Sequence, residues 1–331
     1  MEFYCAAITE NGFFDSFPMV FSHERLKRLY VIKGASGVGK STLMKKVAAE
    51  GERRGLSVDR IYCSSDSNSL DGVIVEDIGM IDGTPPHAYD PKMAGAFERL
   101  IDLGAFLDAS RLEKHRDELF DLLKKKSRAF ERIYSFASIY GKLSSLEASH
   151  FIENVDKEAV RQYVRSLVKR KLSFAKKGKN EMRIFSSLLG DTKIPSYERI
   201  YTVSDRFLFG TVFLDELRNA LREAKVEFFF SPKLPSLERI ETIYIPSLKL
   251  IYTSRFGGRN IHGERFLLKD IPSIDLDGLK EKTASALLDA HREAMSYHSQ
   301  IEKIYLDMMD FCRLEGYSEK LFEELFSSVV E

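Results

Sequence analysis

A glycine-rich segment between an apolar stretch and a helix-forming stretch carries the residue types that bind phosphate. Gly34, Gly39, Lys40 and Ser41 fit a pattern of one glycine, four residues and then Gly-Lys-Ser. A loop with few side chains lets backbone N–H groups converge on phosphate oxygens, and the start of the next helix adds partial positive charge. The residues expected to contact phosphate are Gly34, Ala35, Ser36, Gly37, Val38, Gly39, Lys40, Ser41 and Thr42.

The elements on both sides of this loop fit the same chemistry. The apolar residues after Arg28 predict a strand, and the helix that opens at Lys40 is expected to end near Gly55. Lys40 would reach the β- and γ-phosphates of a nucleotide, and the Ser41 hydroxyl would ligate Mg²⁺. The sequence therefore predicts ATP and magnesium as ligands, with Lys40 as a catalytic residue.

A second metal-binding candidate ends the apolar stretch 73–82, which the sequence predicts to be a strand. Asp82 resembles the carboxylate of a Walker B strand, which would hold Mg²⁺ through water beside the phosphate loop. The alternative is an ordinary buried strand that ends in a loop aspartate. The next residue is Gly83, whereas many motor-type ATPases place a glutamate there to polarise water, and this argues against a fast ATPase.

Three further groups are candidates for chemistry, each with a structural alternative. Asp66, in the polar loop after the second strand of the phosphate-binding half, could orient water or accept a proton, or it could simply stabilise a turn. His87 could contact substrate, or it could be a hydrogen-bonded turn histidine. Arg255 or Arg259 could neutralise charge in a transition state, although an exposed glycine loop explains their segment equally well.

The composition and charge of the chain argue against several other kinds of ligand and partner. Lys plus Arg and Asp plus Glu both number 50 in 331 residues, so no global charge favours nucleic acid or an anionic membrane. The three cysteines have no paired spacing, which argues against disulfides and zinc. No signal peptide is apparent and no apolar run approaches about 18 residues, so we expect a cytoplasmic protein without a membrane partner.

The second half of the chain repeats the first. Residues 199–201 match 28–30, and 302–305 match 131–134, both 171 positions later. Helical stripes follow each sheet-like region, which predicts a helical hairpin in each half. The second half has lost the phosphate loop, because Thr211 stands where Lys40 does and Asp205 would repel phosphate. The sequence therefore predicts nucleotide binding in the first half only.

The predicted fold is α/β and P-loop NTPase-like, with mostly parallel sheets flanked by helices and duplicated in tandem. Four consecutive segments are expected: a nucleotide-binding domain (1–104), a helical hairpin (105–174), a degenerate P-loop-like domain (181–274) and a helical extension (275–331). The chain resembles a family of largely uncharacterised bacterial P-loop proteins, described as ATPases or nucleotide kinases, in which two P-loop halves follow each other. The resemblance covers nearly the whole chain and rests on the segments 33–46, 63–75 and 81–104.

Two function classes follow from these observations. The first is Mg²⁺-dependent ATP hydrolysis, or phosphoryl transfer from ATP to a small molecule, at the first half only. The second is a nucleotide-dependent switch whose helical hairpins bind a protein or nucleic-acid partner. The acceptor or protein partner is unknown, and the balanced charge makes nucleic acid the less expected partner.

Overall fold

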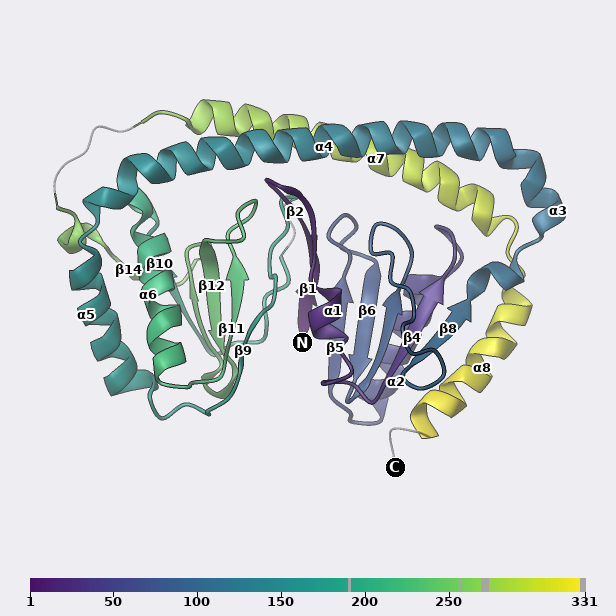
Figure 1. Ribbon diagram of the computed structural model, residues 1–331, viewed down its shortest axis with the longest axis horizontal. Coiled ribbons are helices and arrows are strands. Elements are labelled where there is room, and N and C mark those ends of the chain that lie inside the picture. The colour runs from purple at the N-terminus through teal and green to yellow at the C-terminus, as the bar shows by residue number, and fades with distance from the viewer. Residues whose placement is uncertain (190–191, 256, 269–273, 328–331) are drawn as a thin grey trace. The chain divides into compact units, whose positions relative to one another are not determined.

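The structure is a computed structural model that describes residues 1–331 except 190–191, 256, 269–273 and 328–331. Its contacts divide the chain into two units, each built from separate stretches of sequence. The first unit holds 1–6, 14–133 and 287–331, and the second holds 7–13 and 134–286. Each unit is α/β, with a mixed, mostly parallel sheet and flanking helices (Figure 1).

The sheet of the first unit has six strands in the order β1-β5-β6-β7-β4-β8. β4 runs parallel to both of its neighbours, β7 and β8, and β1 runs parallel to β5. β6 is antiparallel to both β5 and β7. The strands are β1 (Glu2–Tyr4), β4 (Arg28–Lys33), β5 (Val58–Tyr62), β6 (Leu70–Val75), β7 (Ile78–Asp82) and β8 (Glu98–Asp102).

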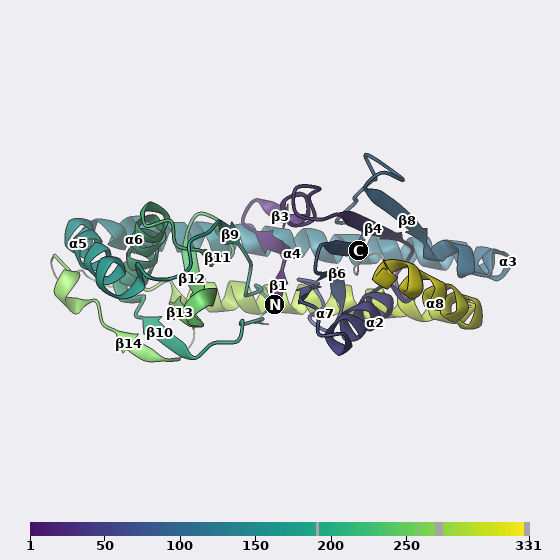
Figure 2. The same ribbon diagram turned by 90° about the horizontal axis from the view of Figure 1, so that it is seen from below.

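Helices α2 (Lys40–Arg53) and α8 (Phe311–Ser327) build the core of the first unit with this sheet. Figures 1 and 2 show α8 beside α2. The buried stripe of α2 recurs at helical spacing, and α8 adds Leu314, Leu321, Leu325 and Phe326 to the same core. Each buried side chain of this size stabilises the fold by about 2 kcal/mol. Helix α8 is therefore an integral part of the first unit.

The sheet of the second unit also has six strands, in the order β14-β10-β13-β12-β11-β9. β10 is parallel to β13 and β14, β11 is parallel to β9, and β12 is antiparallel to both of its neighbours. Strand order and direction thus match the first unit, with β10 in the place of β4. The elements are β9 (Asn180–Met182), β10 (Arg199–Val203), β11 (Phe228–Pro232), β12 (Ile240–Ile245), β13 (Leu250–Thr253), β14 (Arg259–Ile261), α5 (Lys157–Leu167) and α6 (Phe209–Glu223).

Two long helices, α4 (Arg116–Phe151) and α7 (Asp277–Leu306), each have residues in both units. In the first unit they pair through an ion pair between Arg132 and Glu293. In the second unit Lys280 Nζ donates to Glu147 Oε2 at 2.9 Å. The remaining short elements are β2 (Ala6–Thr9), β3 (Gly12–Asp15), α1 (Phe17–Val20) and α3 (Ala109–Leu112).

The helical extensions are connected differently from the prediction. The sequence predicted one hairpin in 105–174 and another helical extension in 275–331. Instead α4 pairs with α7, and α5 packs in the core of the second unit while α8 packs in the core of the first. The four consecutive domain boundaries therefore do not describe the units, because an apolar stripe shows that a helix is buried but not against which sheet. The predicted boundary at 274 also adjoins 269–273, which lie outside the described residues.

The stretch 73–82 is a second correction, because it is not one strand. It forms the end of β6 and all of β7, joined by a tight turn at Glu76, whose φ is +54°. Nearly every residue of both strands is buried, whereas Glu76 and Asp77 between them are charged and exposed and mark the turn. Asp82 nevertheless ends β7, directly beside Ile32 of β4.

Among the helices of the described residues, none combines the length and the apolar character that crossing a membrane requires.

Candidate phosphate-binding site

The glycine loop links the end of β4 to the first turn of α2, as the sequence predicts. Gly37 and Gly39 have φ values of +85° and +92°, which side chains with a Cβ rarely adopt. Val38 between them is fully buried and anchors the loop in the core of the first unit. The loop therefore combines a fixed position with half-buried backbone at the start of a helix of 14 residues.

Lys40 lies inside this loop and faces the carboxylate expected of a Walker B strand. Its Nζ donates to the carbonyl oxygens of Gly34 at 2.8 Å and Ala35 at 2.7 Å. The same Nζ lies 3.6 Å from Asp82 Oδ2. Burial raises the pKa of Asp82, and the charge of Lys40 opposes that rise. The structure thus brings together Lys40 and Asp82, which lie 42 positions apart in the sequence.

The oxygen atoms expected to hold Mg²⁺ also lie in the first unit. Ser41 Oγ accepts a hydrogen bond from the N–H of Leu70 at 2.9 Å, and Asp82 Oδ1 accepts one from the N–H of Thr84, also at 2.9 Å. Hydroxyl and carboxylate oxygens suit Mg²⁺, which usually binds through one or two protein groups together with phosphates and water. No group of three or more His, Cys, Asp or Glu in the described residues could hold a metal alone. The donor chemistry therefore fits a magnesium ion shared with phosphates.

Asp66 lies in the loop between β5 and β6, where its carboxylate organises a turn. Its Oδ1 accepts from the N–H of Asn68 at 3.1 Å and its Oδ2 from the hydroxyl of Ser69 at 2.5 Å. The charge of Asp66 also acts on His298 and Glu302 of α7. These contacts match the turn interpretation, and the catalytic role of Asp66 stays a prediction.

His87 is buried among carboxylates and stabilises the loop after β7. Its Nε2 lies 3.0 Å from Asp71 Oδ2 and its Nδ1 lies 3.8 Å from Asp15 Oδ2. The ring packs edge-on against Phe17, with 4.6 Å between ring centroids. Burial disfavours the charged imidazole, but Asp15 and Asp71 outweigh it and raise the pKa of His87 to about 9. These contacts match the structural interpretation of this histidine.

We expect the free energy of unfolding to fall as the pH rises from about 6.5 to about 9. His87 has an ordinary pKa of 6.5 and a folded pKa of about 9, so the folded chain holds the extra proton in this range. The loss is about 3 kcal/mol at most. Urea unfolding at several pH values measures it. His87→Asn should make the free energy of unfolding depend less on pH in this range. His115→Asn, at a side chain that is 38% exposed, should leave this pH dependence unchanged. An equal slope in both variants contradicts the assignment.

Side chains from the two long helices, absent from the candidates that the sequence offers, also lie at the site. Lys126 of α4 and His298 of α7 lie beside the glycine loop, with His298 Nδ1 3.5 Å from Ser36 Oγ. Helix α7 also packs directly on the loop, because a Cβ built on Gly37 would lie 2.7 Å from the carbonyl oxygen of Glu302. Nearby, His291 Nε2 lies 2.8 Å from the carbonyl oxygen of Ser65. These residues belong to ordinary amphipathic helices, so no local motif could identify them.

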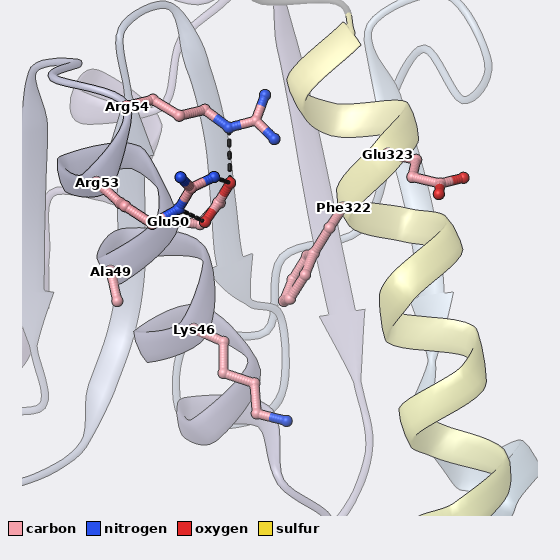
Figure 3. Close-up of a pocket in the computed structure, with 7 residues that line it drawn as sticks. All are labelled: Lys46, Ala49, Glu50, Arg53, Arg54, Phe322 and Glu323. Carbon is pink, nitrogen blue, oxygen red and sulfur yellow. Dashed lines mark hydrogen bonds and ion pairs between the residues drawn. The ribbon is translucent and has the colours of Figure 1, made fainter.

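A pocket with a volume of about 370 Å³ lies between α2 and α8 in the first unit (Figure 3). It is lined by Lys46, Ala49, Glu50, Arg53, Arg54, Phe322 and Glu323. Arg53 and Arg54 both donate to Glu50 and lower the pKa of this carboxyl to about 2. At about 1.5 Å per residue, the pocket lies roughly 9–20 Å along α2 from Lys40, so it is not the phosphate site.

In the second unit a carboxylate of the chain itself lies where the glycine loop lies in the first. Asp205, after β10, accepts a hydrogen bond from the N–H of Thr211 at 2.9 Å and forms an ion pair with Lys233. Phe209 and Thr211 are each only 1% exposed and fill the start of α6. Arg255, one of the two candidates for neutralising charge in a transition state, pairs with Glu241 at 3.3 Å within this unit.

Removing the Asp205 carboxylate is expected to destabilise the second unit without creating a nucleotide site. Asp205→Ala removes the acceptor of the Thr211 N–H in the first turn of α6 and leaves Lys233 without this partner, which should lower the free energy of unfolding by about 2 kcal/mol. Asp156→Ala is the control, because Asp156 caps α5 by accepting from the N–H of Ala159 at 2.9 Å. Asp156→Ala should lower the free energy of unfolding by about 1 kcal/mol. Chemical denaturation measures both, and an equal cost contradicts the added contribution of Lys233.

Comparison of the chain with protein-family models, with curated proteins and with solved structures found no match. The residues of the site and their geometry are therefore the basis for a function.

Proposed function

We propose that the first unit binds ATP with Mg²⁺ and catalyses either ATP hydrolysis or phosphoryl transfer to a small molecule. One observation carries the proposal: Lys40 Nζ lies inside the glycine loop and 3.6 Å from Asp82, which ends the strand adjacent to β4. A motif that matched by chance has no reason to face a largely buried carboxylate, 16% exposed, from a neighbouring strand.

Each group of residues at the site has its own role in binding ATP and Mg²⁺. Backbone N–H groups of residues 34–42 hold the phosphates, and Lys40 exchanges its carbonyl partners for phosphate oxygens. Ser41 and Asp82 are the groups that would hold Mg²⁺, which neutralises phosphate charge when bound. The Asp82 side chain is only 16% exposed, and this partial burial strengthens its interaction with nearby cations.

We further propose that the fold is P-loop NTPase-like and duplicated in tandem, with a second copy that binds no nucleotide. The shared strand order and the shared pattern of parallel and antiparallel pairs support the duplication. The Asp205 carboxylate at the start of α6 supports the loss of phosphate binding, because it would repel a second anion.

Thermal unfolding with nucleotides tests the proposal. A ligand that binds only the folded protein must raise its melting temperature. ATP with Mg²⁺ at a hundred times its dissociation constant is expected to stabilise the first unit by about 2.7 kcal/mol. No shift with ATP, GTP or their diphosphates contradicts the proposal. Phosphate release with and without candidate acceptors then separates a hydrolase from a kinase.

The alternative is a nucleotide-dependent switch, and one contact favours it specifically. The backbone of α7 at Glu302 packs on Gly37, so any movement of the loop moves this helix. Residues 287–306 of α7 belong to the same unit as the loop, so this part of the helix would respond to the bound nucleotide. Slower hydrogen exchange in 291–302 with ATP than with ADP, without measurable turnover, supports the switch. Identical exchange with both nucleotides contradicts it.

A further inference from the structure

Lys126 carries a positive charge into the region of the glycine loop and has an unusual partner there. Its Nζ lies on α4 and donates to His298 Nδ1 at 2.9 Å. The side chain is half-buried, and none of the described carboxylates forms an ion pair with it. An ammonium group removed from water is normally paired with a negative charge, and a neutral imidazole cannot provide one.

His298 is held neutral and links Lys126 to the loop. Burial and, to a smaller extent, the charge of Lys126 together lower the pKa of His298 to about 4. Since Nδ1 accepts from Lys126, the ring proton lies on Nε2, which is 3.4 Å from Glu302 Oε1. The same Nδ1 lies 3.5 Å from Ser36 Oγ in the loop. His298 therefore fixes the ammonium of Lys126 next to the phosphate-binding backbone.

Charges of both signs surround Lys126, but none is paired with it directly. Burial lowers the pKa of Lys126, and the charge of Lys40 adds a smaller lowering. Asp82 is paired with Lys40. Glu302 acts on Lys126, and Asp66 acts on His298, yet among the described ion pairs neither carboxylate joins Lys126. The ammonium of Lys126 therefore lies beside a loop of N–H donors without a directly bound anion.

The position of Lys126 indicates which phosphate of a bound nucleotide it would contact. The loop backbone and Lys40 enclose the phosphate nearest the helix start, so the next phosphate must project away from the loop. Lys126 and His298 come from α4 and α7, outside the loop, and reach it at Ser36. Resting on the proposed function, we propose that Lys126 binds the terminal phosphate of a nucleoside triphosphate and makes the site prefer triphosphates over diphosphates.

The test compares the affinities of ATP and ADP, both with Mg²⁺, by titration calorimetry. Lys126→Ala should weaken ATP binding by about 10- to 100-fold, the range expected for one charge-assisted contact, and ADP binding by less than about threefold. Lys126→Gln keeps an N–H donor for His298 without the charge, and it should weaken ATP binding as the alanine variant does. Lys125→Ala is the matched control, because Lys125 is 49% exposed and pairs with Asp121 at 2.7 Å.

Three results overturn this inference. If Lys126→Ala loses the same affinity for ATP and for ADP, the role of Lys126 is structural. If Lys126→Ala keeps its ATP affinity, Lys126 makes no contact with ATP. If Lys126→Gln keeps full ATP affinity, the charge is not needed. A melting temperature within about 2 °C of wild type confirms that each variant is folded. Wild-type protein that binds neither nucleotide contradicts the proposed function itself, so the two failures are distinguishable.

Discussion

Replacing Lys40 with alanine is expected to lower the affinity for ATP with Mg²⁺ by at least about a hundredfold. The Lys40 ammonium lies within 2.8 Å of two loop carbonyl oxygens, so it is already placed among the groups that surround a phosphate. Each charge-assisted hydrogen bond to phosphate contributes about 1.5–3 kcal/mol, and every 1.4 kcal/mol changes affinity about tenfold. Titration calorimetry with ATP measures the loss.

The matched control for this variant is Lys46→Ala. Lys46 is an exposed residue on the same helix, and it lines the pocket between α2 and α8 rather than the loop. We expect its removal to change ATP affinity less than about twofold, because charges at the surface are screened over this distance. Wild-type affinity in Lys40→Ala would falsify the assignment of the phosphate site. Equal losses in both variants indicate a general charge effect.

The sequence predicted the loop well because its requirements are local. Positive φ at Gly37, a helix start at Lys40 and a preceding strand all depend on residues within one short segment. The position of Asp82 was also predicted, since the C-terminal ends of neighbouring parallel strands meet at one edge of a sheet. The turn at Glu76 was missed because apolar residues lie on both sides of it, although the exposed charged pair Glu76 and Asp77 interrupts the two strands.

The features that depend on distant packing could not be predicted. Helix α8 has the same kind of apolar stripe as α5, yet α8 completes the first unit and α5 the second. Because the two sheets share one topology, the sequence gives no reason for a helix to choose one or the other. Lys126 and His298 lie 172 positions apart on these long helices, so their contact at 2.9 Å follows only from the pairing of α4 with α7.

The contact between α7 and the loop leads to a second large effect, at Gly37. Gly37→Ala is expected to destabilise the first unit by about 3 kcal/mol. Part of this is the cost of a side chain at φ +85°. The rest comes from the new Cβ, which would lie 2.7 Å from the carbonyl oxygen and 3.1 Å from the Cα of Glu302. A backbone clash cannot be relieved by rotating a side chain, so the helix or the loop must move.

Gly55→Ala separates these two contributions. Gly55 follows α2 with φ +75°, and a Cβ there would meet no atom within 4 Å. Gly55→Ala should therefore lower the free energy of unfolding by about 1 kcal/mol, which is the cost of the left-handed backbone conformation alone. Denaturant unfolding gives both values, and their difference measures the packing of α7 on the loop. If the two variants lose equal stability, α7 does not press on the loop. In that case the mechanical link that favours the switch alternative is absent, while phosphate binding by Lys40 is unaffected.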